Sequence, residues 1–309
     1  MNKNHWADVA VAVATLDRPG SLARCLDAIL AGEVLPAELI VVDQGDDDQT
    51  ESVVAERTTT VLQILHIKQE RLGLSASRNV AVARARSPIV AVTDDDCVPS
   101  GGWVAAIQEI LVGDSNAFAA VTGPVLPLEP DEERIWPVSS RTNSARVDFS
   151  GTAPPWRVGT GANFAIRREW LTRIGRYDER LGAGTQGRAG EDMDIIHRLL
   201  GAGGRIRYEP RAVVYHERQS TRRRKTSRSA YGHGIGAYAA IRLRHGELRG
   251  LTMIGQWLVL RGRLLGRALV KGQLGGVREE LLVLGGTVRG AAYGLRAASP
   301  ESRPSSKDS

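Results

Sequence analysis

The sequence has few cysteines, few aromatic residues and no long hydrophobic run. Its 309 residues include two cysteines, Cys25 and Cys97, whose wide separation argues against a disulfide framework and does not match a metal-site spacing. No apolar stretch is long enough to span a bilayer, and the opening MNKNHWADVAVAVATLDRPG lacks the pattern of a cleavable signal peptide. We therefore expect a cytoplasmic protein in a reducing environment.

Charge is unevenly distributed along the chain. Residues 217–309 contain 18 Lys and Arg against 6 Asp and Glu, whereas the residues before them contain 23 against 29. A basic C-terminal part therefore follows an acidic body, which favours contact of that part with phosphate, lipid headgroups or a protein partner. Aromatic residues that could stack on bases are not interleaved with the basic ones, so we expect no nucleic-acid partner.

Apolar strands alternate with amphipathic helices over the first 125 residues. The periodicity predicts strands at 8–14, 38–42, 61–66, 89–93 and 118–123, and helices at 20–30, 72–84 and 102–112. Such alternation predicts an α/β fold with an open, mostly parallel sheet flanked by helices. Ligands bind beyond the carboxyl ends of the strands in such sheets. Because Asp17, Asp43 and the run from Asp94 to Asp96 follow strands, we expect them to meet in one crevice.

The remaining sequence is predicted to contain a long loop, a second set of elements and a helical extension. Residues 128–158, rich in Pro, Ser and Arg, resemble a loop or an insertion. Further strands are predicted at 158–166, 205–208 and 212–215, and helices at 168–174 and 191–200. We predict an α/β domain over 1–220, a basic helical extension over 221–298 and a disordered tail over 299–309.

Three adjacent aspartates, Asp94, Asp95 and Asp96, directly follow the apolar segment IVAVT. Neighbouring carboxylates repel one another, so such a cluster needs a cation or a solvated turn. Mg²⁺ and Mn²⁺ take oxygen ligands and keep positions for water and substrate phosphates. The position at the end of a buried strand favours the metal site, since a surface turn rarely needs three charges there.

Five segments occur in an order that resembles the family 2 glycosyltransferases. They are VAVATLDRPGSLARCLDAIL, LIVVDQGDDDQT, RLGLSASRNVAVARARSPIVAVTDDD, GTGANFAIRREWL and GEDMDIIHRLLGAGGRIRYEPRAVVYHE. The resemblance covers about residues 9–216. It implies a catalytic domain of the GT-A fold, a nucleotide-diphosphate sugar donor and a divalent metal, Mn²⁺ or Mg²⁺. It also implies inverting transfer to a hydroxyl acceptor of a glycan, a lipid-linked intermediate or a natural product.

The resemblance implies a nucleotide pocket formed by four residues of the first half of the chain. Thr15 and Asp17 would line the pocket, Asp43 would accept a hydrogen bond from the base, and Arg71 would lie along the nucleotide. The alternatives are a turn-forming or capping role for Asp43 and a solvated surface position for Arg71. The sequence does not choose among UDP, GDP and dTDP, and UDP is the first expectation.

The resemblance also implies which residues hold the metal. Asp96 would be a direct ligand, Asp94 would contact the ribose or the nucleotide, and His216 would complete the metal site through a ring nitrogen. Because three aspartates are adjacent, the register stays open and Asp95 remains a candidate for the donor site. The alternative for His216 is a structural role.

The resemblance implies an acceptor side built from two later segments. Within the Glu-Asp pair, Asp192 would act as general base and Glu191 would orient the acceptor; simple capping of the helix is the alternative. Gly161 and Asn163 would let the backbone approach the sugar or acceptor closely. Trp103 could stack on a sugar ring, although core packing is the other role open to it.

Two interpretations of the basic extension stay open. Residues 221–225 with Arg228 form a basic cluster, and residues 252–270 mix apolar residues with arginines, which opposes a spanning helix. The segment could lie on anionic lipid at the inner face of the cell membrane as an amphipathic helix. It could instead pack on the catalytic domain with its basic face in solvent.

Two functions other than sugar transfer fit parts of the sequence. A nucleotidyltransferase-like enzyme would carry a glycine-rich, lysine-bearing segment near its first strand, and TLDRPGS does not provide one. A catalytically silent GT-A-like module would recognise glycans or membranes. The presence together of the aspartate run, Glu191, Asp192 and His216 argues against that silent module.

Overall fold

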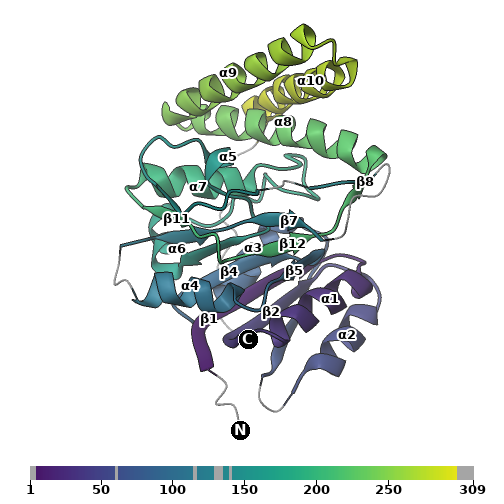
Figure 1. Cartoon of the computed structure of the whole chain (residues 1–309), viewed down its shortest axis with the longest axis vertical. Coiled ribbons are helices and arrows are strands. Elements are labelled where there is room, and N and C mark those ends of the chain that lie inside the picture. The colour runs from purple at the N-terminus through teal and green to yellow at the C-terminus, as the bar shows by residue number, and fades with distance from the viewer. Residues whose placement is uncertain (1–4, 60–61, 114–116, 129–134, 139–140, 298–309) are drawn as a thin grey trace.

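The chain folds into a sheet covered by helices on both faces, with a helical bundle at one end (Figure 1). The structure is a computed structural model and describes residues 5–59, 62–113, 117–128, 135–138 and 141–297. This architecture confirms the predicted α/β class, with a large sheet flanked by helices.

The larger sheet of the described residues has eight strands in the order β3-β2-β1-β4-β10-β6-β11-β9. The strands are β1 (His5–Thr15), β2 (Val34–Asp43), β3 (Ile64–Lys68), β4 (Ile89–Asp94), β6 (Ala120–Thr122), β9 (Val147–Phe149), β10 (Phe164–Arg167) and β11 (Ile206–Tyr208). The strands β3, β2, β1 and β4 pair in parallel. Their carboxyl ends therefore lie at one edge of the sheet, as the sequence predicts.

Alternation along β1 divides its side chains between two apolar cores. Val9, Val11 and Val13 belong to one core, and Ala10 and Ala12 to the other. A strand covered on both faces is apolar at every position, which explains the continuous run in the sequence. The first core is covered by α1 (Pro19–Leu30), α2 (Gln49–Arg57), α4 (Trp103–Gln108) and the π-helical turn η1 (Glu109–Gly113). The second is covered by α3 (Leu74–Arg84), α6 (Arg168–Ile174) and α7 (Glu191–Gly201).

The strand β6 departs from the simple parallel pairing expected for the first 125 residues. β10 lies between β4 and β6 and is antiparallel to both. β6 therefore runs in the same direction as β4 but does not pair with it. The expectation failed because β10 comes from a segment more than 40 residues further along the chain, and local periodicity cannot show such an insertion.

The predicted loop at 128–158 contains short ordered elements where the structure describes it, namely β8 (Ile135–Trp136), β9 and α5 (Pro155–Val158).

Two smaller sheets, of order β5-β12-β7 and β13-β8, are formed among the described residues. Their other strands are β5 (Cys97–Pro99), β7 (Val125–Pro127), β12 (Val214–His216) and β13 (Gln219–Ser220). The antiparallel pairing of β12 with β5 sets His216 opposite Cys97. A histidine distant in sequence is thus brought beside the aspartate run.

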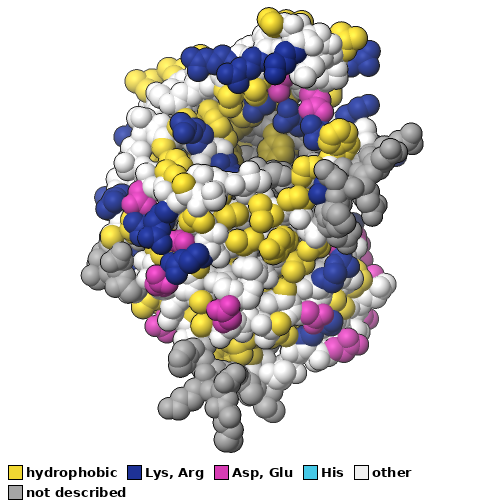
Figure 2. Space-filling model, viewed as in Figure 1, with side chains coloured by type: hydrophobic (Ala, Val, Ile, Leu, Met, Phe, Trp, Pro, Cys, Tyr) yellow, Lys and Arg dark blue, Asp and Glu magenta, His cyan; other side chains and the backbone are white. Residues whose placement is uncertain are grey.

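The bundle consists of α8 (Thr221–Arg244), α9 (Arg249–Val270) and α10 (Leu274–Arg296), with α8 lying between the body and the other two helices (Figure 1). α8 begins at the boundary predicted for the extension, and the predicted tail at 299–309 lies outside the described residues. Leu181 and Met193 of the body share a core with Tyr238 and Trp257 of the bundle. Lys and Arg side chains gather over the bundle (Figure 2). None of the described helices combines the length and the apolar character needed to cross a membrane.

Glycines let α8 and α10 approach each other to backbone contact. A Cβ placed on Gly236 would overlap the carbonyl oxygen of Thr287, and one placed on Gly290 would overlap that of His233. A spacing of four residues keeps such glycines on one face of a helix. The glycines of this seam are Gly232 and Gly236 on α8 and Gly286, Gly290 and Gly294 on α10.

The seam yields a stability prediction with a matched control. Gly236→Ala is expected to lower the free energy of unfolding by about 1–3 kcal/mol, because the new methyl forces the two helices apart. Gly262→Ala, on α9 where a Cβ meets nothing within 4 Å, is expected to raise it by about 0.5–1 kcal/mol through helix propensity. Urea denaturation followed by circular dichroism measures both, and equal effects of the two substitutions would contradict the seam.

Candidate active site

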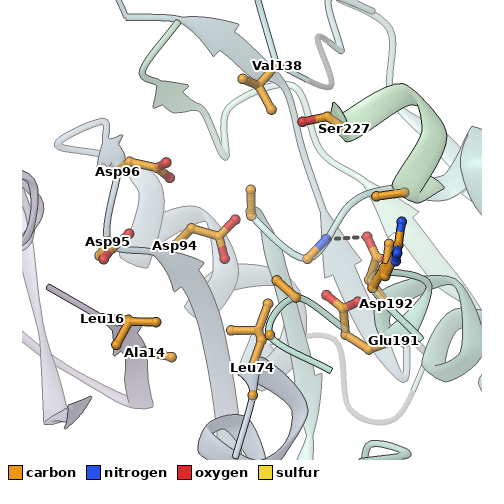
Figure 3. Close-up of a pocket in the computed structure, with 18 of the residues that line it drawn as sticks. Ala14, Leu16, Leu74, Asp94, Asp95, Asp96, Val138, Glu191, Asp192 and Ser227 are labelled. Atoms are coloured by element: carbon orange, nitrogen blue, oxygen red, sulfur yellow. Dashed lines mark hydrogen bonds between the residues drawn. The ribbon is translucent and has the colours of Figure 1, made fainter. Parts of the chain in front are cut away.

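A cavity of about 480 Å³ lies where β1 and β4 end, and α8 and the segment before α7 form its other walls. Nine of the thirteen residues singled out in the sequence line it: Thr15, Arg71, Asp94, Asp95, Asp96, Gly161, Glu191, Asp192 and His216. Figure 3 shows the aspartate run on one side of the pocket and Glu191 with Asp192 on the other. Of the strand-end aspartates expected in one crevice, Asp94, Asp95 and Asp96 line the cavity, whereas Asp17 and Asp43 do not.

The aspartate run contributes two carboxylates to a cluster that can hold a divalent cation. Oxygen atoms of Asp94 and Asp96, the Cys97 sulfur and a ring nitrogen of His216 all lie within 4.8 Å of one another. His216 Nδ1 lies 2.9 Å from the Glu217 carbonyl, while Nε2 lies 3.5 Å from Asp96 Oδ1. When Nδ1 carries the ring proton and donates it to this carbonyl, the lone pair of Nε2 faces the cluster. Two carboxylates and an imidazole nitrogen suit Mg²⁺ or Mn²⁺.

The Cys97 thiol is the weakest candidate ligand of this cluster. It is fully buried, and burial followed by the charges of Asp94 and Asp96 raises the pKa of the thiol well above its usual range. A protonated thiol is a poor ligand, and sulfur is a soft donor for these hard cations. The oxygen and nitrogen donors therefore define the cluster.

Asp95 faces the loop after β1. Its Oδ2 accepts a hydrogen bond from Thr15 Oγ1 at 2.8 Å, and its Oδ1 lies 3.2 Å from Arg18. Burial raises the pKa of Asp95 to about 6, partly offset by Arg18. The middle carboxylate thus ties the turn after β4 to the end of β1.

Two arginines balance the charge of Asp96. Arg18 Nη1 lies 3.0 Å from Asp96 Oδ2, and Arg223 Nη2 of α8 lies 3.2 Å from the same oxygen. Sequence analysis missed both as site residues, although Arg18 follows Asp17 directly and Arg223 belongs to the basic cluster at 221–225. The pairing of Arg223 with Asp96 shows that the extension supplies part of the cavity lining.

Arg78 is a further site residue that the sequence analysis missed. Its buried guanidinium lies 3.0 Å from Asp94 Oδ1 and 3.0 Å from Glu191 Oε1, and donates to the Gly161 carbonyl at 3.2 Å. It therefore connects the two acidic walls of the cavity. A Cβ on Gly161 would lie 2.7 Å from this guanidinium, so the glycine admits the arginine. An arginine inside the predicted helix 72–84, at a position helical spacing would bury, was the available signal.

Asp192 and Glu191 occupy the first turn of α7. Asp192 Oδ2 accepts a hydrogen bond from the Gly161 amide at 2.9 Å, and Oδ1 accepts one from the Met193 amide at 2.8 Å. Burial raises the pKa of Asp192, and burial with the neighbouring Asp192 charge raises the pKa of Glu191 to about 7. Gly190 caps the helix with a φ of 93°, a conformation that favours glycine. Asp192 is held only by backbone amides, whereas Glu191 pairs with Arg78, so Asp192 is the carboxylate better placed to accept a proton.

Two of the predicted nucleotide contacts lie outside the cavity lining. Asp43 is fully buried and accepts hydrogen bonds from Lys68 Nζ at 2.9 Å and from the Gly45 amide at 2.8 Å. Asp17 accepts a hydrogen bond from Arg71 Nη2 at 2.8 Å. Asp17 thus positions a cavity residue, while Asp43 braces the turn after β2.

Trp103 and Asn163 also lie outside the cavity lining. Trp103 Nε1 donates to Asn163 Oδ1 at 2.9 Å, and the Asn163 amide nitrogen donates to the carbonyls of Pro124 and Ala212. Both side chains are buried, and Trp103 belongs to the first apolar core. Their polar atoms fix the segment that carries Gly161, which corresponds to the core-packing alternative for Trp103.

The position of Arg78 generates a stability prediction. Arg78→Met is expected to lower the free energy of unfolding by about 3–5 kcal/mol, because it leaves buried carboxylates without their counter-charge. Arg84→Met, at an exposed position of the same helix, is expected to change it by no more than about 0.5 kcal/mol. Urea denaturation measures both, and similar small losses would mean that Arg78 does not hold the two walls together.

Comparison with known proteins agrees with this geometry. The family model described as "Glycosyltransferase like family 2" matches residues 7–231. The chain is 25% identical to chondroitin synthase of Escherichia coli over 258 residues, covering 72% of this chain and 36% of that protein. It is 24% identical to glucosyl-dolichyl phosphate glucuronosyltransferase of Haloferax volcanii over 218 residues, covering 68% of each. The chain thus spans about a third of the length of the first of these relatives.

A solved structure shows the fold. A mannosyltransferase from Pyrobaculum calidifontis, in complex with GDP-Man and Mn²⁺, superposes with a TM-score of 0.60 at 17% identity, covering 94% of this chain and 88% of that one. The likeness confirms the GT-A fold predicted from the sequence. Since the family model covers most of the chain, including both acidic walls of the cavity, the chain belongs to glycosyltransferase family 2.

Proposed function

We propose that the protein is an inverting glycosyltransferase that moves a sugar from a nucleotide-diphosphate donor to a hydroxyl acceptor. The observation that carries the proposal is one cavity with two acidic walls, Asp94 and Asp96 with His216 on one side and Asp192 on the other. The first wall suits the phosphates of a donor with their metal, and the second suits a hydroxyl that must lose a proton.

Asp94, Asp96 and His216 would hold Mn²⁺ or Mg²⁺ at the donor phosphates. A divalent cation there supplies charge stabilisation for the departing nucleoside diphosphate without a proton donor. Arg18 and Arg223 are paired with Asp96 at this position. They would pair with phosphate oxygens, for which the guanidinium fork is well suited.

The nucleotide would lie toward the ends of β1 and β2. Thr15 and Arg71 line this side of the cavity, and Asp17 holds Arg71. Asp43 and Asp95 act in this proposal by bracing the turns rather than by touching the donor, because their oxygens are already hydrogen-bonded. UDP-sugars are the first choice of donor, and the GDP-Man complex of the related mannosyltransferase adds GDP-sugars to the test, with dTDP-sugars.

Asp192 would take the proton from the acceptor hydroxyl as its oxygen attacks the anomeric carbon. Glu191 is bound to Arg78 and would orient the acceptor. One base on the face opposite the leaving group gives a single displacement, which inverts the anomeric carbon. The glucuronosyltransferase relative is named for a dolichyl phosphate acceptor, which keeps lipid-linked acceptors beside glycans and natural products in this proposal. A cytoplasmic enzyme, peripheral on the inner face of the cell membrane, would suit the lipid-linked class.

The donor site is tested by calorimetry with nucleoside diphosphates and Mn²⁺. Wild-type protein is expected to bind UDP, GDP or dTDP only when Mn²⁺ is present, and Asp96→Asn to weaken that binding by about 10–100-fold. Asp8→Asn, an exposed aspartate at the opposite end of β1, is the control and should bind normally. Metal-independent binding, or none, would favour the silent module over a transferase.

The base is tested once a donor-hydrolysis screen has identified the sugar nucleotide. Asp192→Asn is expected to keep donor affinity and to lower the transfer rate by about 10²–10⁴-fold, since its amide cannot accept the proton. The wild-type rate should fall with decreasing pH as Asp192 protonates, at a pH above the ordinary aspartate range because burial raises its pKa. Transfer that is unchanged in the variant would remove Asp192 from this role.

A further inference from the structure

The bundle exposes an unusual number of large apolar side chains. More than half of the exposed large hydrophobic residues in the described chain lie between residues 248 and 295. Val270 at the end of α9 is 90% exposed, and Leu274 at the start of α10 is 72% exposed. The complete set on α9, α10 and their connections is Leu248, Leu251, Leu258, Val259, Leu269, Val270, Leu274, Leu281, Leu282, Val288 and Leu295. We call this set with the cations beside it the outer face.

The apolar residues of α9 form one stripe along the helix. At 100° per residue, the positions from Leu248 to Val270 fall within about a third of the circumference. Arg263, Arg267 and Lys271 lie along one edge of this stripe and are exposed. The opposite side of α9 is buried in the bundle through residues such as Trp257. α9 therefore presents an apolar stripe with a cationic edge.

The acidic side chains described on or beside the outer face are all paired with arginines, and Glu247, exposed next to Leu248, pairs with Arg242. α9 has none in its sequence, and the two glutamates of α10 turn inward, where Glu279 pairs with Arg224 and Glu280 pairs with Arg228 and Arg261. Among the described residues Arg263, Arg267 and Lys271 have no ion-pair partner. In Figure 2 the Lys and Arg side chains run in a row along the bundle, with hydrophobic side chains beside them.

We propose that the outer face lies on an anionic lipid surface, with α9 and α10 parallel to the membrane plane. The leucines and valines would enter the boundary between headgroups and acyl chains, while the arginines and Lys271 would meet lipid phosphates. Neither helix is apolar enough to span the bilayer, which leaves an interfacial position. The proposal chooses between the two interpretations of the extension: α8 packs on the body, and the other side of the bundle meets lipid.

Lipid fits the outer face better than a second copy of the chain. A symmetric dimer through this face would set the same cationic edge on both partners. Those cations would repel each other, because the acidic groups described on or beside the face, Glu247, Glu279 and Glu280, already pair with other arginines. Anionic lipid provides the complementary charge and accepts apolar side chains at once.

The location of α8 relates the membrane to the cavity. α8 packs under α9 and α10 (Figure 1) and contributes Arg223, Ser227 and Tyr231 to the cavity lining. Two helix layers, α9 with α10 and then α8, each about 10 Å thick, therefore separate the lipid surface from the site. A lipid-linked acceptor would have to extend about 20 Å along the side of the bundle to reach it; this last step rests on the proposed function.

Flotation with lipid vesicles tests the outer face without any substrate. Wild-type protein is expected to float with vesicles of equal phosphatidylglycerol and phosphatidylcholine and not with phosphatidylcholine alone. Each cation near the surface changes partition by about fivefold, so Arg263→Glu/Arg267→Glu should lower it more than about 25-fold. Arg84→Glu/Arg176→Glu, two exposed arginines of the body, makes the same change of net charge and should float normally.

A second variant separates insertion from charge attraction. Leu258→Asn/Leu269→Asn leaves every charge in place and is expected to weaken binding at least tenfold, and thermal melting confirms that it folds. Failure of the wild type to float, or equal loss in the Arg84→Glu/Arg176→Glu control, would overturn the proposal. So would a dimer in sedimentation that the leucine substitutions dissociate. Mn²⁺-dependent nucleotide binding measured on the same samples shows separately whether the donor site is intact.

Discussion

The site depends on keeping five carboxylates close together in one cavity. Asp94, Asp95, Asp96, Glu191 and Asp192 would repel one another if they were left unpaired. Arg78 lies between the two walls and binds a carboxylate from each. Arg18 and Arg223 offset the charge of the aspartate run, and amide hydrogens hold Asp192. The arrangement offsets the repulsion among carboxylates that share one cavity.

These counter-charges come from three distant parts of the chain. Arg18 follows β1, Arg78 lies in α3, and Arg223 lies in the first turn of α8. The cavity is therefore complete only when the sheet, its covering helices and the bundle have all docked. The matched family region likewise extends past the α/β body into α8, as far as residue 231.

Much of the sheet and of the acidic site could be predicted from the sequence because both depend on local signals. Buried parallel strands give apolar runs, and residues after those runs gather at one edge, which located Asp94 and Asp96; Asp192 was found through the resemblance of the Glu-Asp pair. Arg78 was not found, since helical spacing indicates that its position is buried but not that carboxylates from two distant segments surround it. The antiparallel β10, the inward-facing Trp103 and the bracing role of Asp43 depend on pairings across the chain that periodicity does not encode.

The contact between Gly234 of α8 and Gly190 before α7 has a consequence for protein engineering. A Cβ at Gly190 would lie 2.9 Å from the Gly234 backbone, so the two segments touch main chain to main chain. Grafting the helices of another transferase onto this body would therefore require matching glycines on both sides of the joint. A chimera whose extension lacked a glycine at position 234 would force the backbone before α7 to move, so the extension is not an independent module.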